Sequence, residues 1–123
     1  MIYTSYFANV RRLSPEIVPV SIALYSPGWF SGLRYRKLAP TDYILREWKS
    51  NPDVERYIHL YQSDVLARLS PYSVVCDLMV MSEGKDVALL CYEKPDTFCH
   101  RHLVADWLKR NGYKCAELYF TKG

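Results

Sequence analysis

The segment Asp86-Val87-Ala88-Leu89-Leu90-Cys91-Tyr92 is the strongest indication of the fold class, because it is a nearly continuous apolar run of strand length. Such a run is typical of a strand in a parallel sheet that is covered on both faces. An amphipathic segment follows at 98–111, with apolar residues at helical spacing and Asn111-Gly112 as a left-handed C-cap. A strand pattern at 114–120 then completes a βαβ unit, which is right-handed in nearly all proteins. The segment therefore predicts an α/β fold.

Two further strands are predicted before this unit, at 2–8 and 17–25, because both stretches are rich in β-branched and aromatic residues. Pro19 lies near the start of the second, where a missing backbone N–H costs least. The connection at 9–16 is shorter than the dozen or so residues that a parallel crossover needs. These two strands are therefore either not neighbours in the sheet or paired in an unusual way.

Helix signals fill the middle of the chain. Thr41 is a suitable N-cap for a segment that ends at Asn51-Pro52, and a longer helical pattern runs from Asp53 to Leu69. Ser70-Pro71 restarts a helix, with serine as the cap and proline at the first helical position, and Gly84 ends it. We therefore expect a three-layer, Rossmann-like α/β fold with a mostly parallel four-stranded sheet and helices on both faces.

Composition limits the class of protein. The chain has 123 residues, half of them apolar, which predicts one domain over 1–123 and excludes a disordered tail. A net charge of +3 permits an anionic ligand but lacks the dense basic stripe of a polyanion binder. No secretory signal opens the chain, and no apolar run approaches the ~20 residues that span a bilayer. We expect a cytoplasmic protein with no membrane contact; nothing indicates an oligomeric state.

The cysteine pattern points to reduced thiols. The four cysteines lie within apolar patterns, without the density of a disulfide scaffold. They are Cys76, Cys91, Cys99 and Cys115. In a cytoplasmic protein this usage favours thiols over bridges.

The candidate site follows from the fold, since ligands of open parallel sheets bind outside the carboxyl ends of the strands. Three segments are expected to converge there, at 7–9, 26–30 and 91–101. The first two contribute Asn9 and Trp29 as candidate ligand-binding residues. The third is the richest in reactive groups, and Asp96 or Thr97 is expected to cap the helix that follows it.

The start of this last helix breaks a local rule. His100 and Arg101 are expected in its first turn, where the helix dipole disfavours cations. Two interpretations remain open. The helix N–H groups and Arg101 bind a phosphate or carboxylate, or Arg101 pairs internally with Glu93.

Cys99 also has two interpretations. It shares helical spacing with Leu103 and Trp107, which favours a small core residue, whereas an exposed Cys99 beside His100 has the setting of an activated thiol. Cys91, Cys99 and His100 lack a CxxC or HxxxH spacing and an evident fourth ligand, so we predict neither a metal nor a cofactor. A Cys-x5-Arg cradle, dinucleotide and P-loop glycine motifs and a G-x-S-x-G elbow are all absent from the sequence.

The segment at 29–37 mixes aromatic residues with three cations and is the basis for a second function class. Arg34, Tyr35, Arg36 and Lys37 have the chemistry to stack bases and contact phosphates, which is typical of a nucleic-acid-binding module. The competing interpretation is a solvated loop whose Trp29 packs on the sheet edge.

The run 87–94, followed by Phe98-Cys99-His100-Arg101 and 102–108, resembles the domain of unknown function 488 family. Members are small intracellular proteins of bacteria, archaea and phages, with a strand ending in LLC-x-E and a CHR triplet that opens a helix. The stretches 2–4 and 25–30 also resemble this family.

Many members of this family carry an arginine at the end of the second strand. Ala23 or Leu24 stands near that position here, with Arg34 or Arg36 the nearest substitute. The resemblance implies the α/β fold and the location of the site, and it supplies no reaction.

Together these observations favour an enzyme or binding protein for a small phosphorylated or nucleotide-like ligand. Arg101 would hold the anion, Glu93 or His100 would move a proton, and Cys99 is a candidate nucleophile. The predicted site consists of the catalytic candidates Glu93, Cys99 and His100 and the ligand-binding candidates Arg101, Lys94, Tyr92, Asn9, Trp29 and Arg34. A third interpretation is a purely structural network around Arg101.

Overall fold

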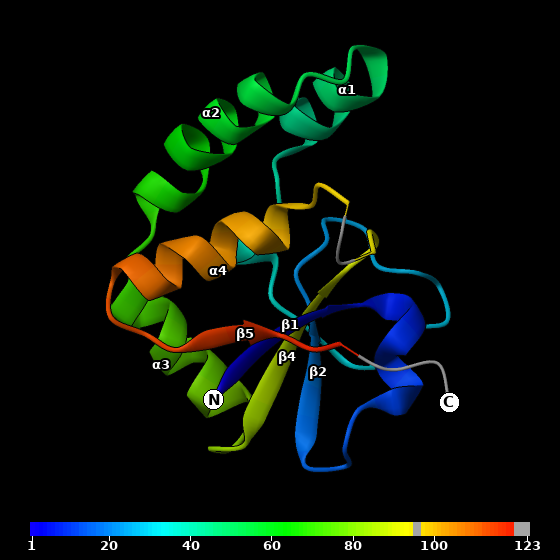
Figure 1. Cartoon of the computed structure of the whole chain (residues 1–123), viewed down its shortest axis with the longest axis vertical. Coiled ribbons are helices and arrows are strands. Elements are labelled where there is room, and N and C mark those ends of the chain that lie inside the picture. The colour runs from blue at the N-terminus through cyan, green and yellow to red at the C-terminus, as the bar shows by residue number, and fades with distance from the viewer. Residues whose placement is uncertain (95–96, 120–123) are drawn as a thin grey trace.

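The computed structural model describes residues 1–94 and 97–119, and these residues form one five-stranded sheet with helices around it (Figure 1). The strands are β1 (Ile2–Tyr6), β2 (Ile17–Ser21), β3 (Leu33–Arg34), β4 (Asp86–Cys91) and β5 (Cys115–Glu117). The α-helices are α1 (Asp42–Ser50), α2 (Val54–Asp64), α3 (Pro71–Met81) and α4 (His100–Arg110). The 3-10 helices are η1 (Phe7–Arg12), η2 (Arg36–Leu38) and η3 (Leu66–Arg68).

The sheet has the order β3-β2-β4-β1-β5, and every paired strand runs parallel. This confirms the Rossmann-like α/β class. β1 and β2 are not neighbours, because β4 lies between them and pairs with both. The short connection at 9–16 is therefore explained by the first alternative, that the two strands it joins are not neighbours in the sheet. The expected count of four strands is wrong, because β3 is a two-residue strand that periodicity does not detect.

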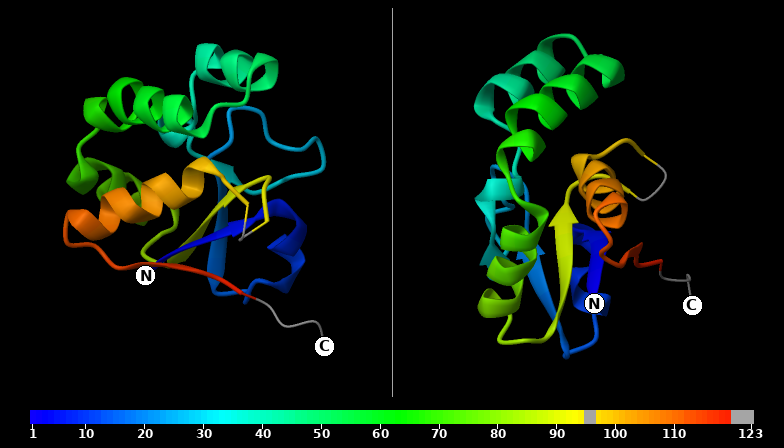
Figure 2. Two further views of the ribbon diagram at one scale, coloured as in Figure 1. Left: turned by 45° about the horizontal axis from the view of Figure 1, so that its top comes forward. Right: turned by 90° about the vertical axis from the view of Figure 1, so that its left-hand side faces the viewer.

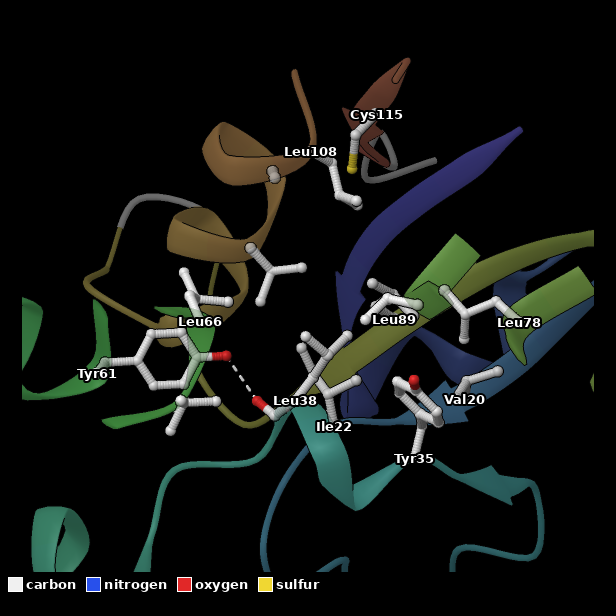
Figure 3. Packing of buried hydrophobic residues seen from close by; sticks show 14 of the residues in the cluster. Val20, Ile22, Tyr35, Leu38, Tyr61, Leu66, Leu78, Leu89, Leu108 and Cys115 are labelled. Atoms are coloured by element: carbon white, nitrogen blue, oxygen red, sulfur yellow. Dashed lines mark hydrogen bonds between the residues drawn. The ribbon is translucent and has the colours of Figure 1, made fainter. Parts of the chain in front are cut away.

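The two faces of the sheet are covered differently. α3 and α4 pack on one face, over a core that includes Val20, Leu89 and Leu108 (Figure 3), and α2 adds Tyr57 and Tyr61 to this core. The opposite face is covered by η1 and the segment after β2, over a smaller cluster that includes Phe7 and Leu90. α1 and α2 lie beyond the carboxyl ends of β2 and β4 (Figures 1 and 2), which places them above the predicted site.

The helix caps confirm the sequence signals. The side chains of Thr41, Asp53 and Ser70 each accept a hydrogen bond from the backbone N–H three residues later. The long helix predicted to reach Leu69 is interrupted at Val65, where the chain turns into η3 and buries Leu66.

The final helix begins later than predicted. Phe98 lies outside α4, and Cys99 is the extended N-cap residue, so Thr97 is not the cap. Asp96 lies outside the described residues. At the other end Gly112, with φ of +88°, takes the left-handed conformation expected there, while Asn111 does not.

All four predicted strands are shorter than the sequence patterns indicate: β1 ends at Tyr6 rather than position 8, and β4 ends at Cys91 rather than Tyr92. β2 ends at Ser21 rather than position 25, because the chain leaves the sheet there to begin the segment that covers its smaller core cluster. β5 ends at Glu117, and the last residue of the predicted strand lies outside the described range.

No helix within residues 1–94 and 97–119 is long and apolar enough to cross a membrane.

Candidate functional site

A hollow of about 430 Å³ opens at the carboxyl ends of β2 and β4, beneath α1 and α2. We call it the carboxyl-end hollow. It is lined by Ala23, Leu24, Tyr25, Pro40, Leu45, Trp48, Lys49, Tyr57, Cys91, Tyr92, Glu93, Phe98, Cys99 and His100. This is the position at which parallel sheets bind ligands. Four predicted site residues meet here: Tyr92, Glu93, Cys99 and His100.

Aromatic side chains form much of its wall. The rings of Trp48, Tyr57 and Phe98 contact one another with centroid separations of 5.1–5.5 Å. Tyr92, which is 53% exposed, donates a hydrogen bond from its hydroxyl to the carbonyl of Tyr25 at 2.6 Å. The hollow therefore presents flat apolar surface to anything that enters it, a surface suited to stacking against a planar ring.

Cys91 and Cys99 form a disulfide at the base of the hollow. The prediction that all four cysteines are reduced is wrong for this pair, while Cys76 and Cys115 are free thiols as expected. The sequence did not indicate this bridge, because Cys91 ends β4 and Cys99 precedes α4, and only the packing of these two elements sets the distance between them. Both are at least 94% buried, which agrees with the interpretation of Cys99 as a core residue.

His100 is buried, and its ring orientation is fixed by the end of β2. Its Nε2 lies 2.8 Å from the carbonyl oxygen of Ile22, so Nε2 carries the proton and donates it to that carbonyl. Its Nδ1 lies 3.9 Å from Cys99 Sγ. Burial lowers the pKa of His100 to about 4, and the neighbouring charge of Arg101 contributes to that shift. The ring is therefore neutral at pH 7, with an unprotonated Nδ1.

Arg101 is fully buried behind the hollow and does not line it. Its Nε and Nη2 donate to the two carboxylate oxygens of Glu117, each at 3.0 Å. Its Nη1 donates to Cys91 Sγ at 3.2 Å and to the main-chain carbonyl of Glu93. The guanidinium also lies over the ring of Tyr6, 5.8 Å from the centroid.

This arrangement decides between the two interpretations of the cationic helix start. Arg101 has an internal partner, and the carboxylate that it pairs with is Glu117 rather than Glu93. The expected pairing with the Glu93 side chain is therefore wrong. The physical reason is topological: β5 lies beside β1, and Thr4 of β1 donates to Glu117 at 2.6 Å, so that carboxylate is held at the sheet edge facing α4.

The remaining predicted site residues lie away from the hollow. Lys94 is exposed and follows Glu93, whereas Asn9 is buried in η1. Trp29 is 60% exposed and reaches the site only indirectly, because it contacts Phe7, which in turn contacts Tyr92. Arg34 is exposed on β3, which forms one edge of the sheet.

Sequence reasoning missed the residues that α1 and α2 contribute. Trp48, Lys49 and Tyr57 line the hollow. In the sequence they are ordinary apolar and charged residues of amphipathic helices, and nothing in that pattern indicates a ligand site. Glu117 was also missed as the partner of Arg101. A signal for Glu117 exists only in the strand order, because a carboxylate on β5 is close to α4 once β5 is placed beside β1.

The structure brings together three metal-ligating side chains whose sequence spacing did not predict a metal site. The sulfur atoms of Cys91 and Cys99 and a ring nitrogen of His100 all lie within 4.8 Å of one another. These residues lie in the wall of the carboxyl-end hollow.

The sheet and the carboxyl-end hollow define an α/β protein of the Rossmann-like class with a candidate ligand site outside its strand ends. A family model described as the active DUF488-N3 subclade, DUF488-N3a, matches residues 9–112. The chain belongs to this DUF488 family, which confirms the resemblance in the sequence. The matched range contains every residue that lines the hollow, and Glu117 lies beyond its end. No curated protein and no solved structure matches the chain.

Proposed function

We propose that the protein is cytoplasmic and binds a small nucleotide-like ligand, with a planar ring and an anionic group, in the carboxyl-end hollow. The observation that carries this proposal is the aromatic-walled hollow of about 430 Å³ at the strand ends. Its volume lies within the roughly 300–1,000 Å³ of typical small-molecule sites. The description of the family as an active subclade is consistent with chemistry at this position.

The aromatic residues supply the surface for the ring. Tyr25 and Tyr92 are both more than half exposed at the rim, and Trp48, Tyr57 and Phe98 form the wall on the helical side. A base placed between these surfaces would lose contact with water and stack on the aromatic rings of the protein. Stacking of a base on an aromatic side chain contributes about 1–3 kcal/mol.

Charged groups at the same opening suit the rest of such a ligand. Lys49 is exposed and lines the hollow, so it replaces the buried Arg101 as the residue that we assign to the anionic group. Glu93 is exposed in the same wall and has a carboxylate that can accept a proton. We assign proton transfer to Glu93 because the ring of His100 is held at Nε2 by the Ile22 carbonyl.

The burial of Tyr35 supports a small ligand over a nucleic acid. Tyr35 is 6% exposed, and its hydroxyl donates to Asp77 at 2.5 Å, so its ring does not face solvent for base stacking. Lys37 is paired with the same carboxylate at 3.3 Å. Two of the four residues expected to form a basic-aromatic surface are therefore engaged within the protein.

The proposal is tested by calorimetric titration with adenosine 5′-monophosphate and with adenosine. We expect saturable binding of the nucleotide, and a loss of about 2–5-fold in its affinity on Lys49→Ala, an amount typical of one exposed ion pair. Adenosine binding is expected to be unchanged by that substitution. Lys109→Ala is the matched control, since Lys109 is exposed on α4 away from the hollow.

Two results would contradict the proposal. One is a wild-type protein that binds neither compound at millimolar concentration. The other is equal nucleotide affinity in the Lys49→Ala and Lys109→Ala variants, which would show that the anionic group does not meet the hollow.

A further inference from the structure

Cys91, Cys99 and His100 have the donor set of a zinc site. Two sulfurs and an imidazole nitrogen suit Zn²⁺, whereas Mg²⁺ and Ca²⁺ take oxygen ligands. The three donor atoms already lie within 4.8 Å of one another. In a tetrahedral zinc site with bonds of about 2.0–2.3 Å, donor atoms are about 3.5–3.8 Å apart. The 3.9 Å between Cys99 Sγ and His100 Nδ1 is close to that spacing.

The second coordination shell is also in place. A metal-bound histidine almost always donates its other ring N–H to a carbonyl or carboxylate, which orients the ring and fixes the tautomer. His100 does this, because its Nε2 donates to the Ile22 carbonyl at 2.8 Å and leaves the Nδ1 lone pair directed at Cys99. This hydrogen bond is an observation independent of the clustering of the three side chains.

The charge balance favours two thiolates at this position. Arg101 Nη1 donates to Cys91 Sγ at 3.2 Å, and a hydrogen bond from a cation stabilises a thiolate. The charge of Arg101 is itself balanced by Glu117. Two thiolates with one Zn²⁺ add no net charge, so the buried site carries no uncompensated ion.

We propose that Cys91, Cys99 and His100 of the reduced protein bind one zinc ion whose fourth position opens into the carboxyl-end hollow. Three protein ligands with one open position is the arrangement of catalytic rather than structural zinc sites. Bound there, zinc would polarise a water molecule or a ligand oxygen in the hollow. The inference goes beyond the proposed nucleotide binding and does not depend on it.

The disulfide between Cys91 and Cys99 makes the site conditional on reduction. A dithiol reductant delivers two electrons and two protons, which convert the disulfide to two thiols, and the reductant becomes a disulfide itself. Zinc then binds the two sulfurs and displaces both protons to solvent. The backbone is compatible with the separated sulfurs, because the Cα atoms of the two cysteines are 7.4 Å apart, wider than the roughly 4.4–6.8 Å usual for a disulfide.

The experiment is titration of the reduced full chain with Co²⁺, followed by displacement with Zn²⁺ against a chromophoric chelator. We expect one equivalent of Co²⁺ with sulfur-to-metal charge-transfer bands, and loss of these bands when Zn²⁺ is added. Cys91→Ser, Cys99→Ser and His100→Gln should each weaken zinc binding by at least about 100-fold, because each removes a direct ligand and even an outer-shell partner contributes about 10–100-fold. Cys76→Ser is the matched control and should bind as the wild type does, because Cys76 lies outside the hollow.

Oxidised wild-type protein provides a second test without any substitution. With the Cys91–Cys99 disulfide intact, the same folded chain should bind no Co²⁺, and reduction should restore binding. Failure of the reduced protein to develop charge-transfer bands would overturn the zinc proposal, as would equal loss in the Cys76→Ser control. Nucleotide titration of zinc-free protein gives a separate readout, so failure of one proposal does not affect the other.

Discussion

The buried pair of Arg101 and Glu117 allows the most quantitative prediction. Arg101 is fully buried, Glu117 is 10% exposed at its side chain, and the two are joined by two hydrogen bonds of 3.0 Å. Arg101→Met keeps the apolar stem but removes the guanidinium. It leaves the Glu117 carboxylate with the hydroxyl of Thr4, and it also removes the donor to Cys91.

Removing one partner of a buried ion pair costs about 3–5 kcal/mol, because the other charge remains buried without compensation. A protein of 123 residues has a free energy of unfolding of about 6–18 kcal/mol, so this loss is a large fraction of it. With a slope of about 2 kcal/mol per molar urea, we expect Arg101→Met to lower the unfolding midpoint by about 2 M. Circular dichroism at increasing urea concentration measures this shift.

The double variant separates the ion pair from side-chain packing. Arg101→Met combined with Glu117→Leu removes both charges, so it should be less destabilised than the sum of the two single variants by about 2 kcal/mol or more. Arg46→Ala is the control, because Arg46 forms an exposed pair with Asp42 and its loss should have little effect. A loss below about 1 kcal/mol for Arg101→Met, or strict additivity in the double variant, would show that the pair with Glu117 is not a buried ion pair that stabilises the fold.

Three further outcomes follow from single contacts, each measured by urea unfolding. Tyr61→Phe removes a buried hydrogen bond of 2.6 Å to a main-chain carbonyl of η2 and should cost about 1–3 kcal/mol; an unchanged midpoint would contradict it. Gly32→Ala should destabilise by about 1–3 kcal/mol, because an added Cβ would lie 2.9 Å from the Pro19 carbonyl oxygen, whereas Gly28→Ala meets nothing within 4 Å and should be neutral. Because burial lowers the pKa of His100 from 6.5 to about 4, the folded state excludes a proton that the unfolded state binds, and zinc-free protein should lose roughly 3 kcal/mol of stability between pH 6.5 and pH 4. His100→Gln should flatten the profile in that window, and an identical profile in both proteins would show that another group is responsible.

The sequence predicted the local elements well, because their signals are local. The caps at Thr41 and Ser70 depend on residues within one turn, and the fully buried strand at 86–91 is apolar along its length. By contrast, β3 has only two residues and forms because β2 offers an open edge at Val20 and Ser21. No pattern in two residues carries that information.

The position of four candidate site residues in the fold follows from a similar local argument. Tyr92, Glu93, Cys99 and His100 line the carboxyl-end hollow, because parallel strands place their carboxyl ends at one edge of the sheet. The partner of Arg101 was not predicted, because it is set by the position of β5 beside β1.

The other missed residues belong to the helices above the sheet. Trp48 and Lys49 line the hollow because α1 lies over the strand ends, which is decided by tertiary packing rather than by the pattern of α1 itself. Tertiary packing also decides the disulfide of Cys91 and Cys99, because it sets the distance between the end of β4 and the start of α4.

The proposed ligand binding takes place in the carboxyl-end hollow. Its most direct test is a titration of ¹⁵N-labelled protein with adenosine 5′-monophosphate, followed by two-dimensional NMR. We expect the largest shift changes on the amides of Tyr25, Trp48, Lys49, Tyr92 and Glu93, while amides on α3 stay unchanged. Changes confined to the exposed residues of β3 and η2, or no changes at millimolar nucleotide, would contradict it.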